Sequence, residues 1–480
     1  MMIARPELGV ALRPYAYSWP RSDSFGAAWK PSANPDFIER AMPESRADLA
    51  NDSRWPALFP SPIAFVTTGR GDSAILEKVV GISIVNRFPY VMAVSVCREP
   101  LSERHYVRGE FSRRLEETGT AVVQFVEPGP VFNRLMDLIA DISDQDGHRR
   151  LPESGYVTRA GVRADAPVLA PAYLAYEGRL VGPGRDFEGE AVNPQPYLDI
   201  GSHRVYLLEI EAIQLRNEIA EGRQQIRWRS LPVWLGHHLS PAMAATADNG
   251  RDAAMESRLA SLAYRKTYTP DYRFPSSTTV AFEADYSRDG MAVKLLPPTP
   301  EQQVEVDNDR ARWPCFFPSS VGMITTWGPG GRPTMMPCGS TTILSRQPLV
   351  VTPCISYSRI NERYAPRATL EFIRAAGSFG CGVPCLDDRV LNALGYLGNV
   401  SDRQDPAKFA NSGLTPIRLG DTPAAAELPI HFDCRVAGSV KLGTHVMFFG
   451  EVTRIFVRRD LTPSTPLQWC PIAEVVDLDG

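Results

Sequence analysis

The chain has 480 residues, of which 44% are apolar and 22% charged, and its formal net charge is −4. These fractions are typical of a folded globular protein, and the length predicts two to three domains. Without a basic excess a nucleic-acid partner is disfavoured, and no apolar run approaches the roughly 18–20 residues of a membrane helix. The eight cysteines are irregularly spaced and the N-terminus lacks the order of a signal peptide. We therefore expect a reduced, cytoplasmic protein.

The sequence contains two related halves. The motif RWPALFPS at residues 54–61 returns as RWPCFFPS at residues 312–319, and GSHRVYLLEI at 201–210 returns as GTHVMFFGEV at 443–452. In both halves the first motif leads to a pair of threonines, Thr67-Thr68 and Thr325-Thr326. A single repeat of this length predicts a duplicated domain and not a solenoid array.

The repeat divides the chain into four segments. They are an irregular N-terminal leader (1–53), a first copy (54–239), a linker with a helix near 251–266 and a Pro-rich leader (240–311), and a second copy (312–480). The first copy carries an insert at 183–200 where the second has only residues 439–442. Because Gly, Pro, Asp and Glu dominate the insert, we expect a surface loop or a lid.

The elements of the second copy are predicted in chain order as short strands joined by turns. We expect strands at 321–327, 349–357 and 379–383, a hairpin turn at 328–333, a helix at 369–376 that ends at Gly377, and a strand pair at 430–439 and 444–454. Strands outnumber helices, and consecutive strands are joined by short turns. The pattern favours a mainly β fold, an antiparallel β-barrel with flanking helices, over a doubly wound parallel sheet.

An ordered set of motifs in the second copy resembles the flavin reductase-like, FMN-binding split-barrel family. The motifs are FPSS (317–320), GRP (331–333), GSTT (339–342), RATL (367–370), KFANSGLTP (408–416) and the GTH corner (443–445). The resemblance covers residues 313–457 and is weaker over residues 55–213 of the first copy. It implies two split-barrel domains in tandem. Because members of this family are typically homodimers with FMN near the subunit interface, it also implies an intramolecular pseudo-dimer.

The resemblance assigns the FMN phosphate and ribityl chain to a hydroxyl-rich loop and a helix start. The candidates are Gly339, Ser340, Thr341, Thr342, Arg367 and Thr369. Hydroxyls, a glycine, a permanent cation and free helix N–H groups are what a phosphate needs. The alternative is a polar turn beside an exposed helix start.

The first copy keeps less of this equipment. Its loop position reads VGISI at residues 80–84, so Ser83 gives one hydroxyl where the second copy has three, while Arg108 and His203 remain as candidates. Losing two phosphate hydroxyls costs about 1–1.5 kcal/mol each, near a hundredfold in affinity. We therefore expect one principal FMN, held by the second copy.

His445 is the catalytic candidate, because an imidazole near the flavin or the nicotinamide can donate a hydrogen bond or a proton. The alternative is a structural histidine, since His203 recurs at the same corner. Cys381 and Cys385 are read as buried thiols in preference to a redox dithiol. No metal site is expected, because the pair His237-His238 lacks further ligands at a suitable spacing.

The leading function is an FMN-binding oxidoreductase that uses NAD(P)H as reductant, with FAD as the alternative flavin. Its partners would be a small-molecule substrate and a flavin-dependent monooxygenase that consumes the reduced flavin. One alternative is an FMN-dependent tailoring enzyme of bacterial specialised metabolism, in which the insert closes over a small organic substrate. The other is a non-catalytic scaffold that binds a flavin or a heme. Further homo-oligomerisation of the pseudo-dimer is left open.

Overall fold

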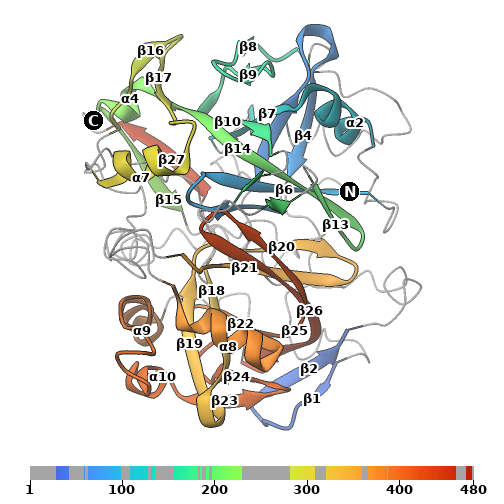
Figure 1. Ribbon diagram of the computed structural model, residues 1–480, viewed down its shortest axis with the longest axis vertical. Helices are drawn as coiled ribbons and strands as arrows, with labels where there is room; N and C mark the ends of the chain where they lie inside the picture. Colours follow the sequence, from blue (N-terminus) through green and yellow to red (C-terminus); the bar gives the residue numbers. More distant parts are fainter. Residues whose placement is uncertain are drawn as a thin grey trace.

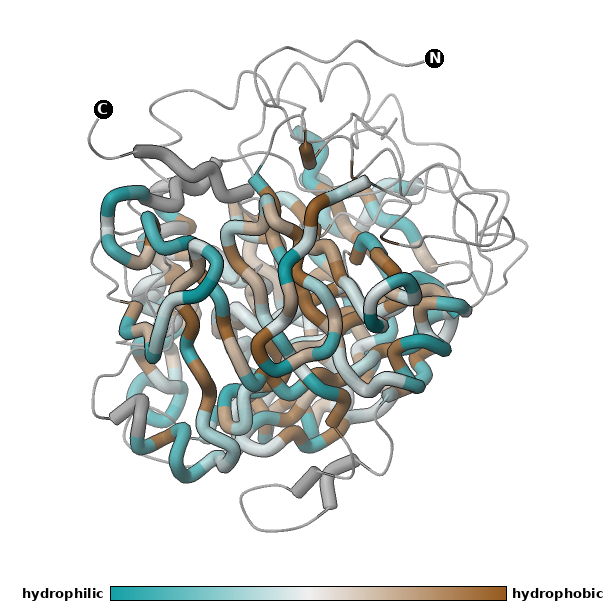
Figure 2. Tube along the Cα trace, turned by 90° about the horizontal axis from the view of Figure 1, so that it is seen from above, coloured by the Kyte–Doolittle hydropathy of each residue, from teal (hydrophilic) through white to brown (hydrophobic). Residues whose placement is uncertain are grey.

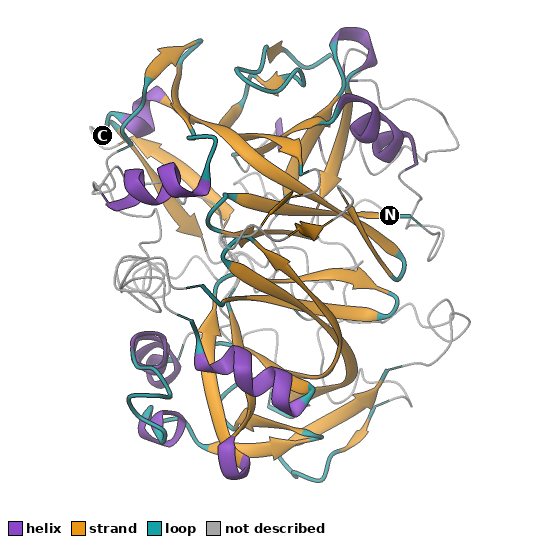
Figure 3. Ribbon diagram, in the orientation of Figure 1, coloured by secondary structure: helices purple, strands orange, loops and turns teal. Residues whose placement is uncertain are grey.

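A computed structural model describes residues 29–42, 59, 63–79, 81–98, 109–127, 131–132, 135, 151, 155–181, 184–185, 191–193, 197–229, 282–308, 321–358, 366–385, 387–460 and 472–477. Strands dominate this part of the chain, as Figures 1 and 3 show. All strand pairs within it are antiparallel. The predicted mainly β class is therefore confirmed. No helix among these residues is long and apolar enough to cross a membrane.

Two curled sheets carry the two copies, and both have the same strand order (Figure 1). In the first copy the path is β4 (Ile75–Val79), β3 (Ala64–Thr68), β7 (Thr120–Val126), β10 (Ala172–Leu180), β14 (His203–Arg216), β6 (Val91–Cys97), β5 (Gly81–Asn86). In the second it is β19 (Arg332–Cys338), β18 (Gly322–Gly328), β22 (Ser378–Val383), β25 (Ile430–Leu442), β26 (His445–Arg458), β21 (Leu349–Ser356), β20 (Thr341–Arg346). Helices α2 (Gly109–Thr118) and α8 (Ala368–Ala376) precede β7 and β22. The repeat in the sequence thus corresponds to a repeat in the fold.

The threonine pairs that mark the repeat make equivalent hydrogen bonds in both copies. The hydroxyl of Thr68 donates to the carbonyl of Thr120 at 2.8 Å, and that of Thr326 donates to Ser378 at 3.0 Å. The preceding threonines donate to Pro167 and Pro423. A buried hydroxyl needs a partner, so these threonines tie β3 and β18 to neighbouring segments in the same way.

Buried apolar residues form the interior of both sheets. Figure 2 marks the hydrophobic positions in brown along the chain trace. One cluster runs through both copies and includes Val66, Tyr176, Ile324 and Phe432. A second cluster lies between the copies. Its members are Val85, Val91, Ala93, Ile200, Val205, Leu207, Leu344, Val350, Cys354, Leu442 and Met447. Burial of this shared apolar surface holds the two copies together.

Each copy docks a glycine corner onto the X-Pro turn of the other. Gly201 has a positive φ of 54° and lies against Gln347 and Pro348, and Gly443, with φ 56°, lies against Phe88 and Pro89. A Cβ at either glycine would overlap the facing carbonyl oxygen, so only glycine fits. Both X-Pro bonds are cis. The contacts are reciprocal, as in a two-fold dimer interface.

The two leaders are exchanged between the copies. The N-terminal leader forms β1 (Lys30–Pro31) and β2 (Phe37–Ala41), and β2 pairs with β26 of the second copy. The Pro-rich leader forms β16 (Tyr286–Arg288) and β17 (Met291–Leu295), and β17 pairs with β14 of the first copy (Figure 1). Describing these leaders as irregular was therefore wrong for β1, β2, β16 and β17, and the Pro-rich leader also contains helix α7 (Pro300–Asn308). The strands are short. Strands β2 and β17 pair with strands of the other copy, whereas β1 and β16 pair with β2 and β17.

The insert of the first copy is also partly strand. It contains β11 (Gly184–Arg185), β12 (Ala191–Asn193) and β13 (Tyr197–Ile200), and β13 pairs with β14. Strand β12 lies beside β25 of the second copy. The prediction of a loop was wrong for these residues, because Tyr197–Ile200 extends the hairpin that the turn at Gly201 closes.

The remaining elements lie around the two sheets. They are α4 (Asn217–Ala220), β8 (Thr158–Arg159), β9 (Val168–Leu169), β15 (Gln224–Arg229), α7 (Pro300–Asn308), α9 (Asp388–Asn399), α10 (Lys408–Asn411), β23 (Pro416–Leu419), β24 (Thr422–Ala425) and β27 (Ile472–Asp477). Strand β15 pairs with β27, so the C-terminal ends of the two copies also meet. The helix expected near 251–266, the RWP tripeptides, His237-His238 and Arg108 lie outside the described residues.

The glycine corner predicts a difference between two alanine substitutions. Gly377→Ala, at φ 65° with open space around the new Cβ, should cost about 1–2 kcal/mol of unfolding free energy. Gly443→Ala should cost a further ~1–3 kcal/mol, because its Cβ overlaps Phe88. Urea unfolding of the two variants measures the difference. Equal losses would show that the corner does not pack tightly on the first copy.

Candidate functional site

The segment predicted as a hydroxyl-rich loop is a two-residue turn, Gly339-Ser340, between β19 and β20, followed by Thr341 and Thr342 as the first residues of β20. The prediction of a loop was therefore wrong for the two threonines, which pair with β21. The carbonyl of Ser340 accepts a hydrogen bond from Cys354 N at 3.0 Å, which anchors the turn to β21. Thr341 donates its hydroxyl to the carbonyl of Cys338 at 2.9 Å. Thr342 Oγ1 is buried and has no hydrogen-bond partner in the described part of the chain. The start of β20 therefore holds one hydroxyl that the fold satisfies, on Thr341, and one that it does not, on Thr342.

Arg367 stands immediately before α8, with its backbone N–H donating to the carbonyl of Ser356 at 3.0 Å. Burial lowers the pKa of its guanidinium, and the neighbouring Cys338 partly opposes that shift. Among the described residues its guanidinium forms no hydrogen bond or ion pair. The Ser356 hydroxyl is likewise buried without a partner. A half-buried, unpaired arginine before a nine-residue helix creates a positive site suited to an anion.

Thr369 lies in the first turn of α8 on the face that packs into the domain. Its side chain is buried together with Ala368, Leu370 and Ile373. The helix start is therefore not the exposed one of the alternative interpretation. Helix α8 ends at Gly377 in the left-handed conformation, as predicted.

His445 begins β26 and is the cross-strand partner of Ser356, the residue whose carbonyl receives Arg367 N. Burial, and then the charges of Arg367 and Arg87, lower the pKa of His445 to about 3. Its Nδ1 lies 2.8 Å from the hydroxyl of Thr444. Near neutral pH the imidazole is therefore neutral. The arrangement supports a hydrogen-bonding role for His445 and disfavours an imidazolium that would donate a proton.

Two residues of the first copy that influence His445 were not predicted from the sequence. Arg87 acts electrostatically on His445 from the turn between β5 and β6, and Asn86 binds the corner that carries His445. The available signal was the tripeptide R-x-P, which occurs in both copies at Arg87 and Arg346. In the reciprocal contact, Arg346 of the second copy acts on His203 of the first. Burial, and then the charge of Arg346, lower the pKa of His203 to about 3.

The first copy lacks the anion-binding features at the matching place. Gly119 of the first copy corresponds to Gly377 of the second, because both follow the helix. Phe111 therefore takes the position of Thr369, and its side chain is 1% exposed. The neighbouring Glu110 brings a carboxylate to the first turn of α2, where Arg113 holds its pKa below the usual value. The hydroxyl of Ser83 donates to the carbonyl of Ile84 at 3.3 Å.

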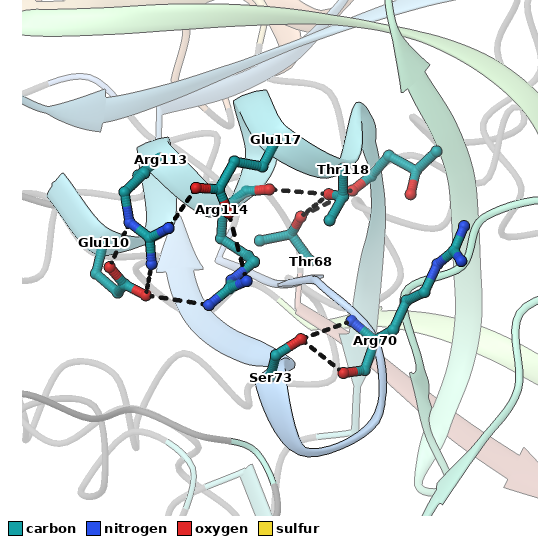
Figure 4. Close-up of polar contacts among 9 residues, drawn as sticks. Thr68, Arg70, Ser73, Glu110, Arg113, Arg114, Glu117 and Thr118 are labelled. Atoms are coloured by element: carbon teal, nitrogen blue, oxygen red, sulfur yellow. Dashed lines mark hydrogen bonds and ion pairs between the residues drawn. The ribbon is translucent and has the colours of Figure 1, made fainter.

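Figure 4 shows how the cations of α2 are neutralised. Arg113 pairs with Glu110 and Glu117, and Arg114 lies 3.4–3.5 Å from the same two carboxylates. The helix therefore offers no free positive charge among these residues, and Glu110 itself occupies the position that the helix dipole makes favourable for an anion. Arg108, the first-copy candidate, lies outside the described residues.

Lys408, in the KFANSGLTP motif, forms a buried ion pair with Asp402, with Nζ 3.1 Å from Oδ2. The same Nζ donates to the carbonyl of Val400 at 3.1 Å. These bonds link the end of α9 to α10, so Lys408 gives the KFANSGLTP motif a structural role.

The two cysteines that were weighed as a redox dithiol are buried in the structure. Cys381 and Cys385 are free thiols, 0% and 5% exposed, and burial raises both pKa values. Protonated, buried thiols are inert, which favours the packing interpretation. Within the described part of the chain no cluster of histidine, cysteine or acidic side chains could hold a metal ion.

Comparison with known proteins agrees with the resemblance of the second copy. Residues 314–473 match the family model for the flavin reductase like domain. A flavin reductase (NADH) of Kitasatospora aureofaciens is 27% identical over 154 residues, which are 32% of this chain and 73% of that protein. An uncharacterized protein of Aeropyrum pernix is 29% identical over 111 residues, 22% of this chain and 40% of that protein.

Two similar solved structures each cover about a third of the chain. Nitrilotriacetate monooxygenase component B from Bacillus cereus has a TM-score of 0.30 at 18% identity and covers 38% of this chain and 97% of its own. Flavoredoxin of Desulfovibrio vulgaris (Miyazaki F) has a TM-score of 0.26 at 20% identity and covers 33% and 86%.

The lowered pKa of His445 predicts a pH dependence of stability. An unfolded histidine titrates near pH 6.5, so below that pH the unfolded chain binds a proton that the folded site, with a pKa of about 3, does not. Stability should therefore fall between pH 7 and pH 5. His445→Gln should make that fall shallower by up to one proton, measured from urea midpoints at several pH values. An unchanged slope would show that His445 titrates normally in the folded protein.

Proposed function

We propose, from the premise that residues 314–473 form a flavin reductase-like domain, that the chain is an FMN-dependent oxidoreductase with NAD(P)H as its reductant. The flavin phosphate is held at the second copy, by Arg367, by the turn Gly339-Ser340 and by Thr341 and Thr342 at the start of β20. The wall on the other side of the site comes from the first copy through Asn86 and Arg87.

The observation that carries this proposal is the unpaired guanidinium of Arg367. Elsewhere in the described chain arginines such as Arg113 and Arg204 are paired with carboxylates. Leaving a half-buried cation unpaired costs free energy unless an anion binds there. The buried, unpartnered hydroxyls of Thr342 and Ser356 fit a phosphate or ribityl group in the same way.

The residues of this chain hold and orient the flavin, while hydride chemistry belongs to the bound flavin ring. Arg367 supplies charge-assisted hydrogen bonds to the phosphate, and the start of α8 adds free N–H groups. His445 provides a neutral imidazole that orients the reacting partner. The apolar interface between the copies excludes water.

The first copy supports the site without holding an equal flavin. Phe111 replaces the hydroxyl of Thr369, and Glu110 repels a phosphate. Ser83 offers a single hydroxyl, which lies in strand β5 and donates to the carbonyl of Ile84. A second phosphate would lose several hydrogen bonds and meet a carboxylate, and each lost bond weakens affinity about fivefold to tenfold. The chain is therefore a pseudo-dimer with one principal flavin.

NADH as the reductant is supported by the relative named flavin reductase (NADH). In the simplest version the reduced flavin leaves and serves a flavin-dependent monooxygenase. NADH oxidation should then require added free flavin and rise with its concentration until saturation. FAD is the alternative flavin for the same site.

A second version keeps FMN bound and reduces a small organic substrate. The observation in its favour is the insert, because β12 lies beside β25, the strand that leads to the Gly443 corner. In this version the purified protein is yellow, NADH bleaches it, and added free flavin does not increase turnover. A coloured protein that NADH never bleaches would favour the non-catalytic scaffold.

The phosphate assignment predicts unequal effects of two arginine substitutions on one helix. Arg367→Ala should raise the dissociation constant for FMN about 10-fold to 100-fold, because charge-assisted hydrogen bonds to the phosphate are lost. Arg374→Ala removes an exposed charge at the opposite end of α8 and should change it less than twofold. Fluorescence titration of the apoprotein measures both. Equal affinities for FMN in the two variants would contradict the assignment.

A further inference from the structure

The two glycine corners carry histidines in equivalent settings. His203 follows Ser202 and His445 follows Thr444, and in each case the preceding hydroxyl lies 2.8 Å from Nδ1. A hydroxyl has one proton to donate and can also accept. Which ring nitrogen carries the hydrogen therefore depends on what else the hydroxyl contacts.

At the second-copy corner the hydroxyl contacts Asn86 of the first copy. Asn86 Oδ1 accepts the backbone N–H groups of Thr444 at 2.9 Å and His445 at 3.0 Å, and Thr444 Oγ1 lies 3.1 Å away. Asn86 Nδ2 donates to the carbonyl of Pro89 at 2.7 Å, which fixes the orientation of the amide. Because Oδ1 has no hydrogen, the Thr444 hydroxyl must be the donor in their contact.

At the first-copy corner the hydroxyl has a different partner. The backbone N–H of Gln347 donates to Ser202 Oγ at 3.1 Å, and within the described chain His203 Nδ1 is the acceptor left for the proton of that hydroxyl. The position that matches Asn86 is Ser345, since Asn86 pairs with Val91 and Ser345 with Val350, each two residues after the cis-proline. The Ser345 hydroxyl is buried without a hydrogen-bond partner in the described chain.

We propose that Asn86 is a positioning residue which, through Thr444, holds His445 as the Nδ1–H tautomer with a bare Nε2, while His203 is held as the opposite tautomer. Thr444 gives its proton to Asn86 and therefore accepts one from His445 Nδ1. His445 then presents an acceptor, and His203 presents an N–H donor. The degenerate copy thereby sets the hydrogen-bonding character of the active copy.

The consequence for ligand choice rests on the proposed function. A bare Nε2 of His445 accepts a hydrogen bond from an N–H or O–H of the bound partner and repels a carbonyl oxygen. The carboxamide N–H₂ of a reduced nicotinamide has this donor character.

Nitrogen-15 NMR of the flavin-free protein, labelled at the histidine rings, tests the tautomers directly. Signals are assigned by their loss in His445→Gln and His203→Gln. We expect a pyrrole-type Nδ1 and a pyridine-type Nε2 for His445, and the reverse for His203. A pyrrole-type Nε2 in His445 would overturn the proposal whatever the protein binds.

Substitutions distinguish a hydrogen-bond relay from His445 through Thr444 to Asn86 from a role of Asn86 in supporting the corner alone. Asn86→Ser, which places there the residue found at 345, should reverse the tautomer of His445, and Ser345→Ala should leave both histidines unchanged. Thr444→Ser keeps the hydroxyl and should keep the tautomer of His445. Thr444→Val removes the hydroxyl, and the ring nitrogens of His445 should then no longer show a single tautomer. A folded Asn86→Ser protein with an unchanged His445 signal would refute the role of Asn86.

Kinetics then connect the relay to the proposed reaction. Asn86→Ser should raise the KM for NADH about fivefold, the worth of one hydrogen bond, whereas Ser345→Ala should leave the KM unchanged. An unchanged KM together with the reversed tautomer would keep the relay and reject its role in nicotinamide binding. No NADH turnover in the unmodified protein would reject the proposed function alone.

Discussion

The structure depends on a reciprocal contact in which each copy inserts a glycine corner against the proline turn of the other. A side chain at Gly201 or Gly443 would overlap the facing backbone, and the backbone of Ser202 hydrogen-bonds to Gln347 at 2.7 Å. The apolar cluster between the copies surrounds these corners. The corners also carry His203 and His445, so the contact that joins the copies determines the surroundings of both imidazoles.

An exchange of edge strands reinforces the pairing. Strand β2 extends the sheet of the second copy at Arg454–Arg458, and β17 extends that of the first at Ala212–Arg216, the matching end of the equivalent strand. Each copy therefore covers an edge that would otherwise be open to pairing with another chain. Neither sheet has these edge strands without the segment that precedes the other copy.

Within this symmetric frame the two halves have diverged at a few positions with chemical consequences. The helix start holds Thr369 in one copy and Phe111 in the other, and the turn beside the corner holds Asn86 in one and Ser345 in the other. The second copy keeps the free cation, and the first copy keeps the amide that reaches across to it. A single site can thus be built from both copies, with different residues selected on each side.

Local signals in the sequence were enough to predict the repeat, the strands of the second copy near 321–327, 349–357, 379–383, 430–439 and 444–454, and helix α8 with its end at Gly377. Alternating or continuous apolar runs and turn residues determine such elements over short distances. The Asp289-Gly290 pair, with φ 51° and 77°, is also a local hairpin signal, and it could have predicted β16 and β17.

The contacts across the interface could not be predicted in this way. Asn86 bonds to residues 358 and 359 positions later in the chain, and no motif marks it. Arg87 acts on His445 only because the two copies are packed together. Likewise, the leaders become strands because they find edges in the other copy, which their own short apolar runs do not indicate.

The central claim is that a two-fold partnership inside one polypeptide carries a single principal flavin at the second copy. Native mass spectrometry of the protein after saturation with FMN and removal of the excess tests it most directly. The account predicts one flavin bound for each chain. Two flavins bound with equal strength on each chain, or none, would contradict it.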